Sequence, residues 1–403
     1  MRASIERDVR LVLASQALRA FGYGFGSVLL ASTLALRGLS AIEVGVMLGA
    51  LVAGPVLAQL AVARWADSWG RRRSYLALYL ALGLSDVVFA STAPLWVLVA
   101  MALTGALSAE VIESGPFTTL ELSMLSGRID ADALTAGFGW YNAIAAAGGS
   151  LGALSAALPQ VTQRLINQAP PDRVWFLLLV PVAAAGVIVA RRLSPSVELI
   201  DGRRKVAPLG PSRPAVTRLA GLFALDAFAG SFVVQTFIAF WLIDRLGATT
   251  AIVGALFAAI GVIQTLSFLA APLIARRWGL LNTMVFTHLP SNLLLASVAF
   301  APNLAVATGL LLARAALSQM DVPTRQAYVM TLVEPQERTA ANAYTNTARY
   351  LARPIGPLLA GATLTLTAGA PFLIAGLLKS VYDLTLWSWF RTIPLPTRKE
   401  TTS

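Results

Sequence analysis

The sequence is dominated by long apolar blocks, most of them about 17–25 residues long, the length of a helix that crosses a bilayer. The blocks are continuous rather than alternating, which excludes an outer-membrane barrel. Charged residues make up 13% of the chain, against roughly 25% in a soluble domain. The chain is therefore predicted to be an all-α polytopic membrane protein.

Twelve transmembrane spans are predicted from these blocks. Their approximate ranges are 11–36, 41–63, 74–93, 95–119, 134–158, 174–190, 218–243, 250–273, 281–300, 303–323, 340–367 and 370–390. The long connection after the sixth span is rich in proline, glycine and arginine, which predicts irregular structure. The predicted organisation is an N-terminal half (1–190), a cytoplasmic linker (191–217) and a C-terminal half (218–403).

The net charge of +11 is distributed unevenly over the predicted loops. The termini, the linker and the loops on their side hold most of the lysine and arginine residues. The opposite loops hold Arg37, Arg164, Arg173 and Arg245. Cytoplasmic loops are enriched in basic residues, so both termini are predicted to be cytoplasmic, in a bacterial-type inner or plasma membrane. The charge then implies contact with anionic lipids and gives no support to nucleic-acid binding.

Several chemistries are disfavoured by composition. The chain has no cysteine and a single histidine, His288, which excludes disulfides and a multi-histidine metal site. The Gly-x-Ser-x-Gly pattern at 148–152 falls inside a predicted helix, where a hydrolase elbow cannot form. No nucleotide-binding loop occurs, so no cofactor is predicted and an ion gradient is the expected energy source. His288 is interpreted as a packing residue, with pH sensing as the alternative.

The two halves show an internal repeat. Arg19-Ala20-Phe21 in the first span matches Asp226-Ala227-Phe228 in the seventh, and Asn142 in the fifth span matches Asn346 in the eleventh. Two related six-helix halves are typical of secondary transporters whose substrate site lies between the repeats.

A loop motif connects the second and third spans. The segment 63–72 reads Ala-Arg-Trp-Ala-Asp-Ser-Trp-Gly-Arg-Arg. It resembles the loop motif of the major facilitator superfamily, Gly-x3-Asp-Arg-x-Gly-Arg-Arg, with alanine for the first glycine and serine for the first arginine. The resemblance extends over essentially the whole chain. It implies twelve transmembrane helices in two pseudo-symmetric halves that alternate access to a central cavity.

The resemblance also assigns a role to this loop. In the superfamily it latches one conformation of the transport cycle, so Asp67, Gly70, Arg71 and Arg72 are candidate gating-loop residues. The alternative is a basic turn that only fixes topology, with an acid that lends local solubility. Asp321 and Arg325, four residues apart at the end of the tenth span, are a candidate second gate.

The fifth span resembles the antiporter motif of the same superfamily. Gly139, Gly148 and Gly152 have the expected spacing, while Ala153 replaces the proline of the motif. This resemblance to the drug/metabolite:proton antiporter branch favours efflux over uptake. Small residues at these spacings let helices pack closely.

Charged residues inside the predicted spans are the candidate coupling sites. A charge at the bilayer centre costs about 2.5–3.5 kcal/mol on insertion scales, so such residues should pair or line a cavity. The coupling or ion-pair candidates are Asp226, Glu113, Glu110, Arg19 and Arg314. Arg19 is predicted to pair with Glu110 or Glu113, and Asp226 with an arginine of the tenth or eleventh span. The competing interpretation is that all of these are structural ion pairs. Asp86 and the Lys379/Asp383 pair, on peripheral helices, are predicted to be structural residues.

The predicted substrate is a small amphipathic or anionic organic solute. The substrate-binding candidates are Arg349, Arg353, Tyr23, Asn142 and Asn346. Pro354 follows these arginines and predicts a local bend. The predicted function is proton-coupled efflux by a monomeric secondary active transporter. The alternatives are an uncoupled or proton-symport uptake facilitator and a lipid flippase of the same fold, whereas an enzyme lacks a nucleophile–base constellation.

Overall fold

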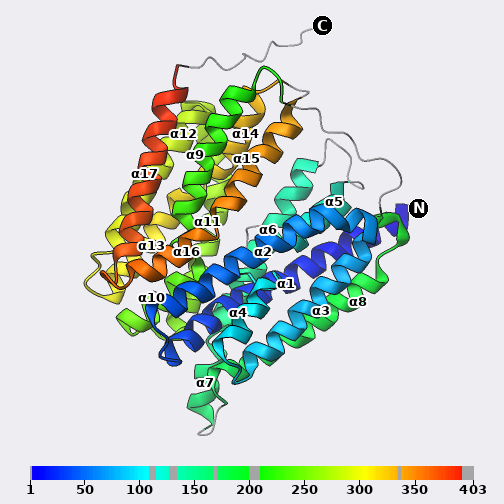
Figure 1. The fold of residues 1–403 in the computed structure, drawn as a ribbon, viewed down its shortest axis with the longest axis vertical. Coiled ribbons are helices and arrows are strands. Elements are labelled where there is room, and N and C mark those ends of the chain that lie inside the picture. Colours follow the sequence, from blue (N-terminus) through cyan, green and yellow to red (C-terminus); the bar gives the residue numbers. More distant parts are fainter. Residues whose placement is uncertain are drawn as a thin grey trace. The chain divides into compact units, whose positions relative to one another are not determined.

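The computed structural model describes residues 2–108, 115–126, 134–166, 170–198, 209–334 and 337–392, and its regular secondary structure in these ranges is helical (Figure 1). The first helices are α1 (Arg2–Leu36), α2 (Ala41–Trp69), α3 (Arg71–Ala90), α4 (Leu95–Leu103), α5 (Pro116–Ser126), α6 (Leu134–Ser155), α7 (Leu158–Leu165), the 3-10 helix η2 (Asp172–Leu179) and α8 (Val180–Arg192). The all-α prediction is confirmed.

The later part of the described chain is also helical. It contains η3 (Pro195–Val197), α9 (Arg213–Ser231), α10 (Gln235–Leu246), α11 (Thr250–Trp278), α12 (Leu280–Val298), α13 (Leu304–Ser318), α14 (Asp321–Leu332), α15 (Arg338–Ala352), α16 (Ile355–Thr363) and α17 (Ala370–Phe390). Within the described ranges, six segments are long and apolar enough to cross a membrane. They are Ala41–Ala66, Arg71–Ala90, Tyr141–Leu165, Asp172–Arg192, Arg213–Leu246 and Thr250–Trp278.

Of the other predicted spans, the first, ninth and twelfth carry buried charged or polar side chains, and the remaining three are interrupted. The fourth span is divided into α4 and α5, the tenth into α13 and α14, and the eleventh into α15 and α16. Pro354 lies in the eleventh break, where its ring and missing N–H prevent a continuous helix, as the sequence predicts. After α4 the chain turns at Gly105, whose φ of 75° is a left-handed value that favours glycine.

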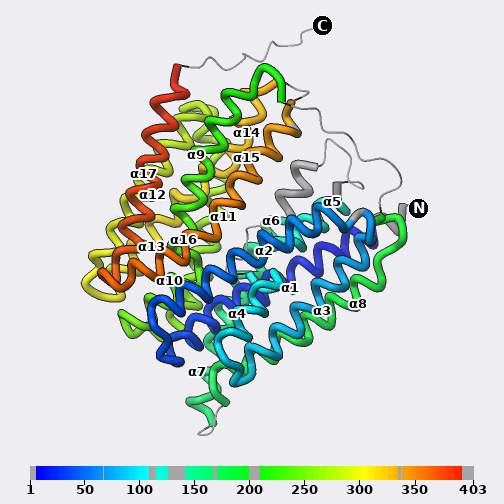
Figure 2. The backbone as a smooth tube through the Cα atoms, in the orientation of Figure 1, coloured from blue at the N-terminus to red at the C-terminus, as the bar shows by residue number. Residues whose placement is uncertain are grey.

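The chain forms two compact units, and the first includes two segments from later in the chain. The first comprises 1–202, 233–262 and 357–368, and the second comprises 203–232, 263–356 and 369–403. In the first unit α1 packs on α6, and α3 packs on α8 although they are far apart in the chain (Figure 2). In the second unit α17 packs on α12 and α9 (Figure 2). The boundaries of the predicted halves follow chain order instead and stay a prediction.

Glycine contacts join the two later segments, 233–262 and 357–368, to the rest of the first unit. A Cβ built on Gly361 of α16 would lie 2.5 Å from the Cα of Gly45 in α2. One built on Gly254 of α11 would lie 2.2 Å from the backbone oxygen of Ala153 in α6. Both distances are too short for any side chain, so these helices touch through their backbones, as small residues allow in membrane helices.

Candidate functional site

The first candidate site is a buried ion pair in the first unit, between Arg19 of α1 and Glu121 of α5. Two guanidinium nitrogens of Arg19 donate to the two carboxylate oxygens of Glu121, and the Nη2–Oε2 distance is 2.8 Å. Arg19 is 2% exposed and Glu121 is fully buried. A two-bonded arginine–carboxylate pair is among the strongest charge-assisted contacts in proteins, and its planar geometry is specific to arginine.

Further polar side chains complete this pair. The hydroxyl groups of Tyr75 and Tyr141 donate to the two oxygens of Glu121, the first at 2.5 Å. The amide oxygen of Gln16 accepts a hydrogen bond from Arg19. Glu121 therefore has four donors from three helices besides its own, and the desolvation of the two charges is offset by hydrogen bonds.

The partner of Arg19 differs from the predicted one. The sequence predicts Glu110 or Glu113, which lie outside the described residues, and the structure pairs Arg19 with Glu121. Sequence hydropathy ends the fourth span at 119, so Glu121 is left in a loop. The chain turns at Gly105, however, and the second segment of the span runs on to Ser126.

A sequence signal for Glu121 does exist. Phe117, Leu120 and Met124 recur at helical spacing, and all three are buried in the structure. An apolar helical face that continues to 124 would have placed an acid at 121 inside the span.

The second candidate site is a larger cluster around Asp226 in the second unit. The Lys379 ammonium of α17 donates to Asp226 of α9 at 2.5 Å. Arg325 of α14 places one guanidinium nitrogen 3.5 Å from Asp226 and 2.9 Å from Asp321. All four side chains are less than one-tenth exposed. Asp226 and Asp321 therefore share one arginine. If either acid loses its charge, Arg325 is attracted to the remaining carboxylate alone.

A histidine extends this cluster towards a third acid. His288 of α12 places Nδ1 2.9 Å from Asp383 and Nε2 3.9 Å from Asp226. Asn292 donates to Asp383 at 2.8 Å. His288 thus lies between two carboxylates, with Asp383 within hydrogen-bond distance and Asp226 farther away.

Two predictions for this region can be compared with the structure. An arginine of the tenth or eleventh span is predicted beside Asp226, and Arg325, at the end of the tenth span, lies there. The lysine of α17 makes the closer contact and is not predicted. Lys379 and Asp383 are predicted to be structural residues of a peripheral helix and His288 a packing residue; the structure shows that all three belong to the Asp226 cluster, and their structural role stays a prediction. The reason is that α17 packs on both α12 and α9, which brings their polar faces together.

Two of the three remaining predicted arginines interact with this cluster, and all three lie in the second unit. Arg314 of α13 is half-buried and interacts electrostatically with Asp226 and Asp321. Arg349 of α15 is half-buried and interacts electrostatically with Asp226. Arg353, also half-buried, caps the C-terminal end of α15. Their roles in substrate binding stay predictions.

Three further binding candidates occupy different environments. The Tyr23 hydroxyl donates to the backbone oxygen of Ala106 at 2.8 Å. The Asn346 amide donates to the side-chain oxygen of Asn342, one turn earlier in α15. Asn142 of α6 is exposed. The structure does not bring these three residues to one place within either unit, and their binding roles stay predictions.

The gating loop forms a sharp turn that is capped by an acid. Gly70 ends α2 with φ 105°, a value that favours glycine, as predicted for this turn. The carboxylate of Glu198 accepts hydrogen bonds from the backbone N–H groups of Arg71 and Arg72 at 2.6 and 3.2 Å. An acid here complements the positive end of the α3 dipole. The side chain of Asp67 lies outside the described residues, so its latch role stays a prediction.

The sequence matches a known protein family over most of its length. A model of the Major Facilitator Superfamily matches residues 12–357. The chain belongs to this superfamily. It is therefore a membrane transporter and not an enzyme, and the predicted all-α polytopic fold of the superfamily is confirmed.

Relatives of this superfamily member are distant. An uncharacterized membrane protein of Saccharomyces cerevisiae is 23% identical over 391 residues, which cover 88% of this chain and 87% of the relative. A mutant of the nucleoside transporter NupG has a similar structure, with a TM-score of 0.75, 14% identity and coverage of 95% and 100% of the two chains. A D-xylose–proton symporter has a TM-score of 0.67, 14% identity and coverage of 94% and 97%. These solved structures show the shared fold.

Proposed function

We propose that this transporter is a secondary active exporter that exchanges protons for a small amphipathic or anionic organic solute. The proposal includes a monomer in a bacterial-type cytoplasmic membrane, with both termini on the cytoplasmic side. The proton gradient is its energy source. The observation that carries the proposal is the buried cluster in which Asp226 is shared by Lys379, Arg325 and His288.

This cluster suits proton coupling because its acid and its cations depend on each other. While Asp226 is ionised, it holds Lys379 and Arg325. A proton taken up by Asp226 would cancel that attraction and leave the cations able to bind an anion. An anion bound by these cations would in turn favour the protonated acid, so substrate and proton influence each other's binding.

The excess of arginine supports an anionic or amphipathic solute. Arg314 and Arg349 are half-buried and interact electrostatically with Asp226, whose closest ion-pair partner is Lys379. Guanidinium groups in a partly desolvated place bind carboxylate or phosphate with planar, two-bonded geometry. The export direction is supported by the small residues of α6, where a Cβ on Gly152 would lie 2.0 Å from a backbone oxygen of α1. Such tight packing fits the antiporter-type motif.

A counterflow experiment in proteoliposomes tests this proposal. Purified protein is reconstituted with a pH-sensitive dye inside, and organic anions, zwitterions and cations of similar size are added in turn. An exchanger predicts that inward movement of the added solute is accompanied by outward proton movement, so the interior becomes more alkaline. Substrate movement without any pH change would indicate an uncoupled facilitator, and movement of proton and substrate in the same direction would indicate symport. Either result would overturn the exchange mechanism.

A further inference from the structure

Asp86 of α3 differs from the other buried acids of the first unit. It is fully buried, and neither carboxyl oxygen has a hydrogen-bond partner among the described residues. Glu121, by comparison, accepts four hydrogen bonds. An acid that is buried without a partner needs a physical explanation, because an ionised carboxylate in such a place has lost its hydration without any compensating contact.

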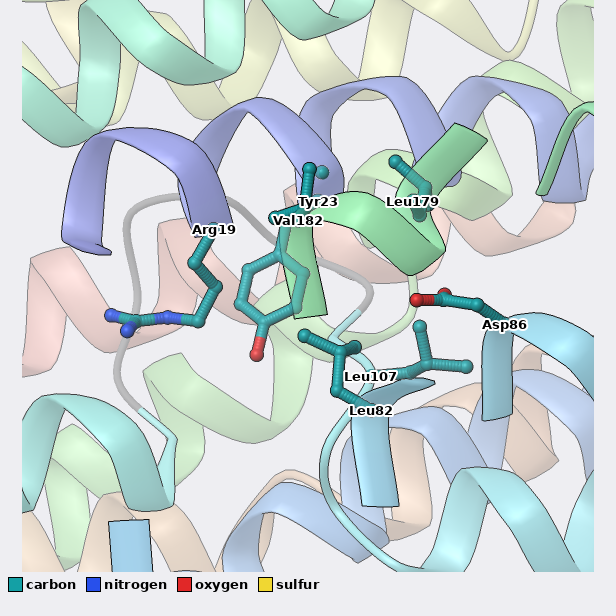
Figure 3. A pocket seen from close by; sticks show the side chains of 8 residues that line it. Arg19, Tyr23, Leu82, Asp86, Leu107, Leu179 and Val182 are labelled. Atoms are coloured by element: carbon teal, nitrogen blue, oxygen red, sulfur yellow. The ribbon is translucent and has the colours of Figure 1, made fainter. Parts of the chain in front are cut away.

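A small cavity adjoins the carboxyl group of Asp86. Its volume is about 10 Å³, roughly the space that one water molecule occupies. Leu82, Leu107, Leu179 and Val182 form its apolar walls. The Asp86 carboxyl points into this space, as Figure 3 shows. The site is therefore an acid facing a water-sized, largely apolar chamber.

Among the described residues, the charged group on the cavity wall does not neutralise Asp86. Arg19 and Tyr23 of α1 also line the cavity, but the guanidinium of Arg19 points away from Asp86 and is bound to Glu121 (Figure 3). The ring of Tyr23 lies between them, and its hydroxyl donates to the backbone at Ala106 (Figure 3).

Other charged groups on the elements packed against α3 lie away from this cavity. Helix α4 has no titratable residue. The titratable groups of the remaining elements whose side chains the structure describes are Glu43 and Arg64 of α2, Glu121 of α5, Asp172 and Arg173 of η2, and Arg191 and Arg192 of α8. None of them lines the cavity. Asp172 accepts a hydrogen bond from Ser32, and Glu121 is held by Arg19.

We propose that Asp86 is a proton-binding site, separate from the Arg19–Glu121 pair, and that it carries a proton in this conformation. The neutral acid can remain in these apolar surroundings. Loss of the proton would create a charge that needs either more water or a cation, and Arg19 is the cation on the same cavity wall. Deprotonation therefore favours a rearrangement of α1 against α3. A role of Asp86 in transport rests on the proposed proton coupling. The proposal that Asp86 is protonated in this conformation does not rest on it.

Infrared spectroscopy of the full-length protein in lipid tests the protonated state directly. A protonated carboxyl group has a C=O stretch distinct from that of a carboxylate. Asp86→Asn should remove one such band, and Asp86→Glu should shift it. Ser85→Ala is the matched control, because Ser85 is its buried neighbour and bonds only within its own helix. An unchanged band in Asp86→Asn would show that Asp86 is ionised and would overturn the proposal.

The pH dependence of thermal stability gives an independent measurement. As pH rises, ionisation of Asp86 leaves an unpaired charge in the protein interior, so the wild type should lose melting temperature relative to Asp86→Asn. Curves that stay parallel from neutral to alkaline pH would contradict the proposal. Both measurements are made without transport. A transporter that proves to be uncoupled would therefore refute the proposed function while leaving the Asp86 site intact.

Discussion

Arg19 and Glu121, which are distant in the sequence, form a two-bonded ion pair that is almost completely buried. Removing one partner of such a pair leaves an uncompensated buried charge, which typically costs about 3–5 kcal/mol. The pair joins α1 to α5 and has tyrosine hydroxyls on its carboxylate. It is therefore a structural element of the first unit as well as a candidate coupling site.

The first prediction concerns this pair. Glu121→Gln should lower stability by about 3–5 kcal/mol because Arg19 loses its counter-charge. The double variant Arg19→Gln/Glu121→Gln should be less destabilised than the two single variants together, since it leaves no buried charge behind. Thermal unfolding of the three variants in one detergent gives this double-mutant cycle. Additive losses would show that the two side chains do not depend on each other.

The second prediction concerns coupling at Asp226. Asp226→Asn is isosteric and should abolish proton-driven accumulation while substrate exchange continues, because the amide cannot carry the coupling proton. Accumulation and exchange are measured in the same proteoliposome preparation. Asp244→Asn is the matched control, since Asp244 is the acid of a solvent-exposed pair with Arg245. Normal accumulation by Asp226→Asn across an imposed pH gradient would exclude Asp226 as the coupling site.

The sequence predicts the architecture better than it predicts side-chain partners. Apolar length and basic loops identify a polytopic helical protein because both depend on composition along one segment. The partner of Asp226 depends on which helices touch. Lys379 and Asp383 on α17 and His288 on α12 join the cluster because α17 packs on α12 and α9. That packing has no local signature in a single sequence.

The third prediction concerns the backbone contact between α16 and α2. Gly361→Ala would place a methyl group 2.5 Å from Gly45 and 2.6 Å from the oxygen of Ala41, both backbone atoms that cannot move aside alone. Overpacking of this kind costs about 1–3 kcal/mol. Thermal unfolding should show a clear loss of melting temperature.

Gly309→Ala in α13 is the control for this substitution. No neighbouring atom lies within 4 Å of a Cβ at Gly309, and alanine is the better helix former by about 1 kcal/mol. This variant should match or exceed the wild-type melting temperature. Equal destabilisation by both substitutions would refute a specific contact at Gly361.

The fourth prediction is a pH dependence at the start of α9. Hydrogen bonds from Ser212 and Gly210 to the Glu337 carboxylate lower the pKa of Glu337 below its usual range. An acid with a lowered pKa in the folded state contributes stability above its unfolded pKa, and that contribution is lost as pH falls through the folded pKa. The difference in melting temperature between Glu337→Gln and the wild type should therefore become smaller as the buffer is acidified below about pH 4.

Melting temperatures measured from neutral to acidic pH check this dependence. Glu6→Gln is the control, because Glu6 belongs to an exposed pair with Arg10 that should contribute little at any pH. A gap between Glu337→Gln and the wild type that does not change with pH would argue that the carboxylate does not stabilise α9.

The fifth prediction separates substrate binding from structure at Arg353. Lysine keeps the positive charge but cannot reproduce the planar, two-bonded contact of a guanidinium with a carboxylate or phosphate. If Arg353 binds the substrate, Arg353→Lys should weaken the affinity for an anionic solute about tenfold, equivalent to about 1.4 kcal/mol, with an unchanged melting temperature. Arg349→Lys, one turn earlier, tests whether the two arginines act together. Affinity measured by equilibrium binding, alongside thermal unfolding, distinguishes the cases, because a structural arginine would lower the melting temperature of its lysine variant and leave affinity intact.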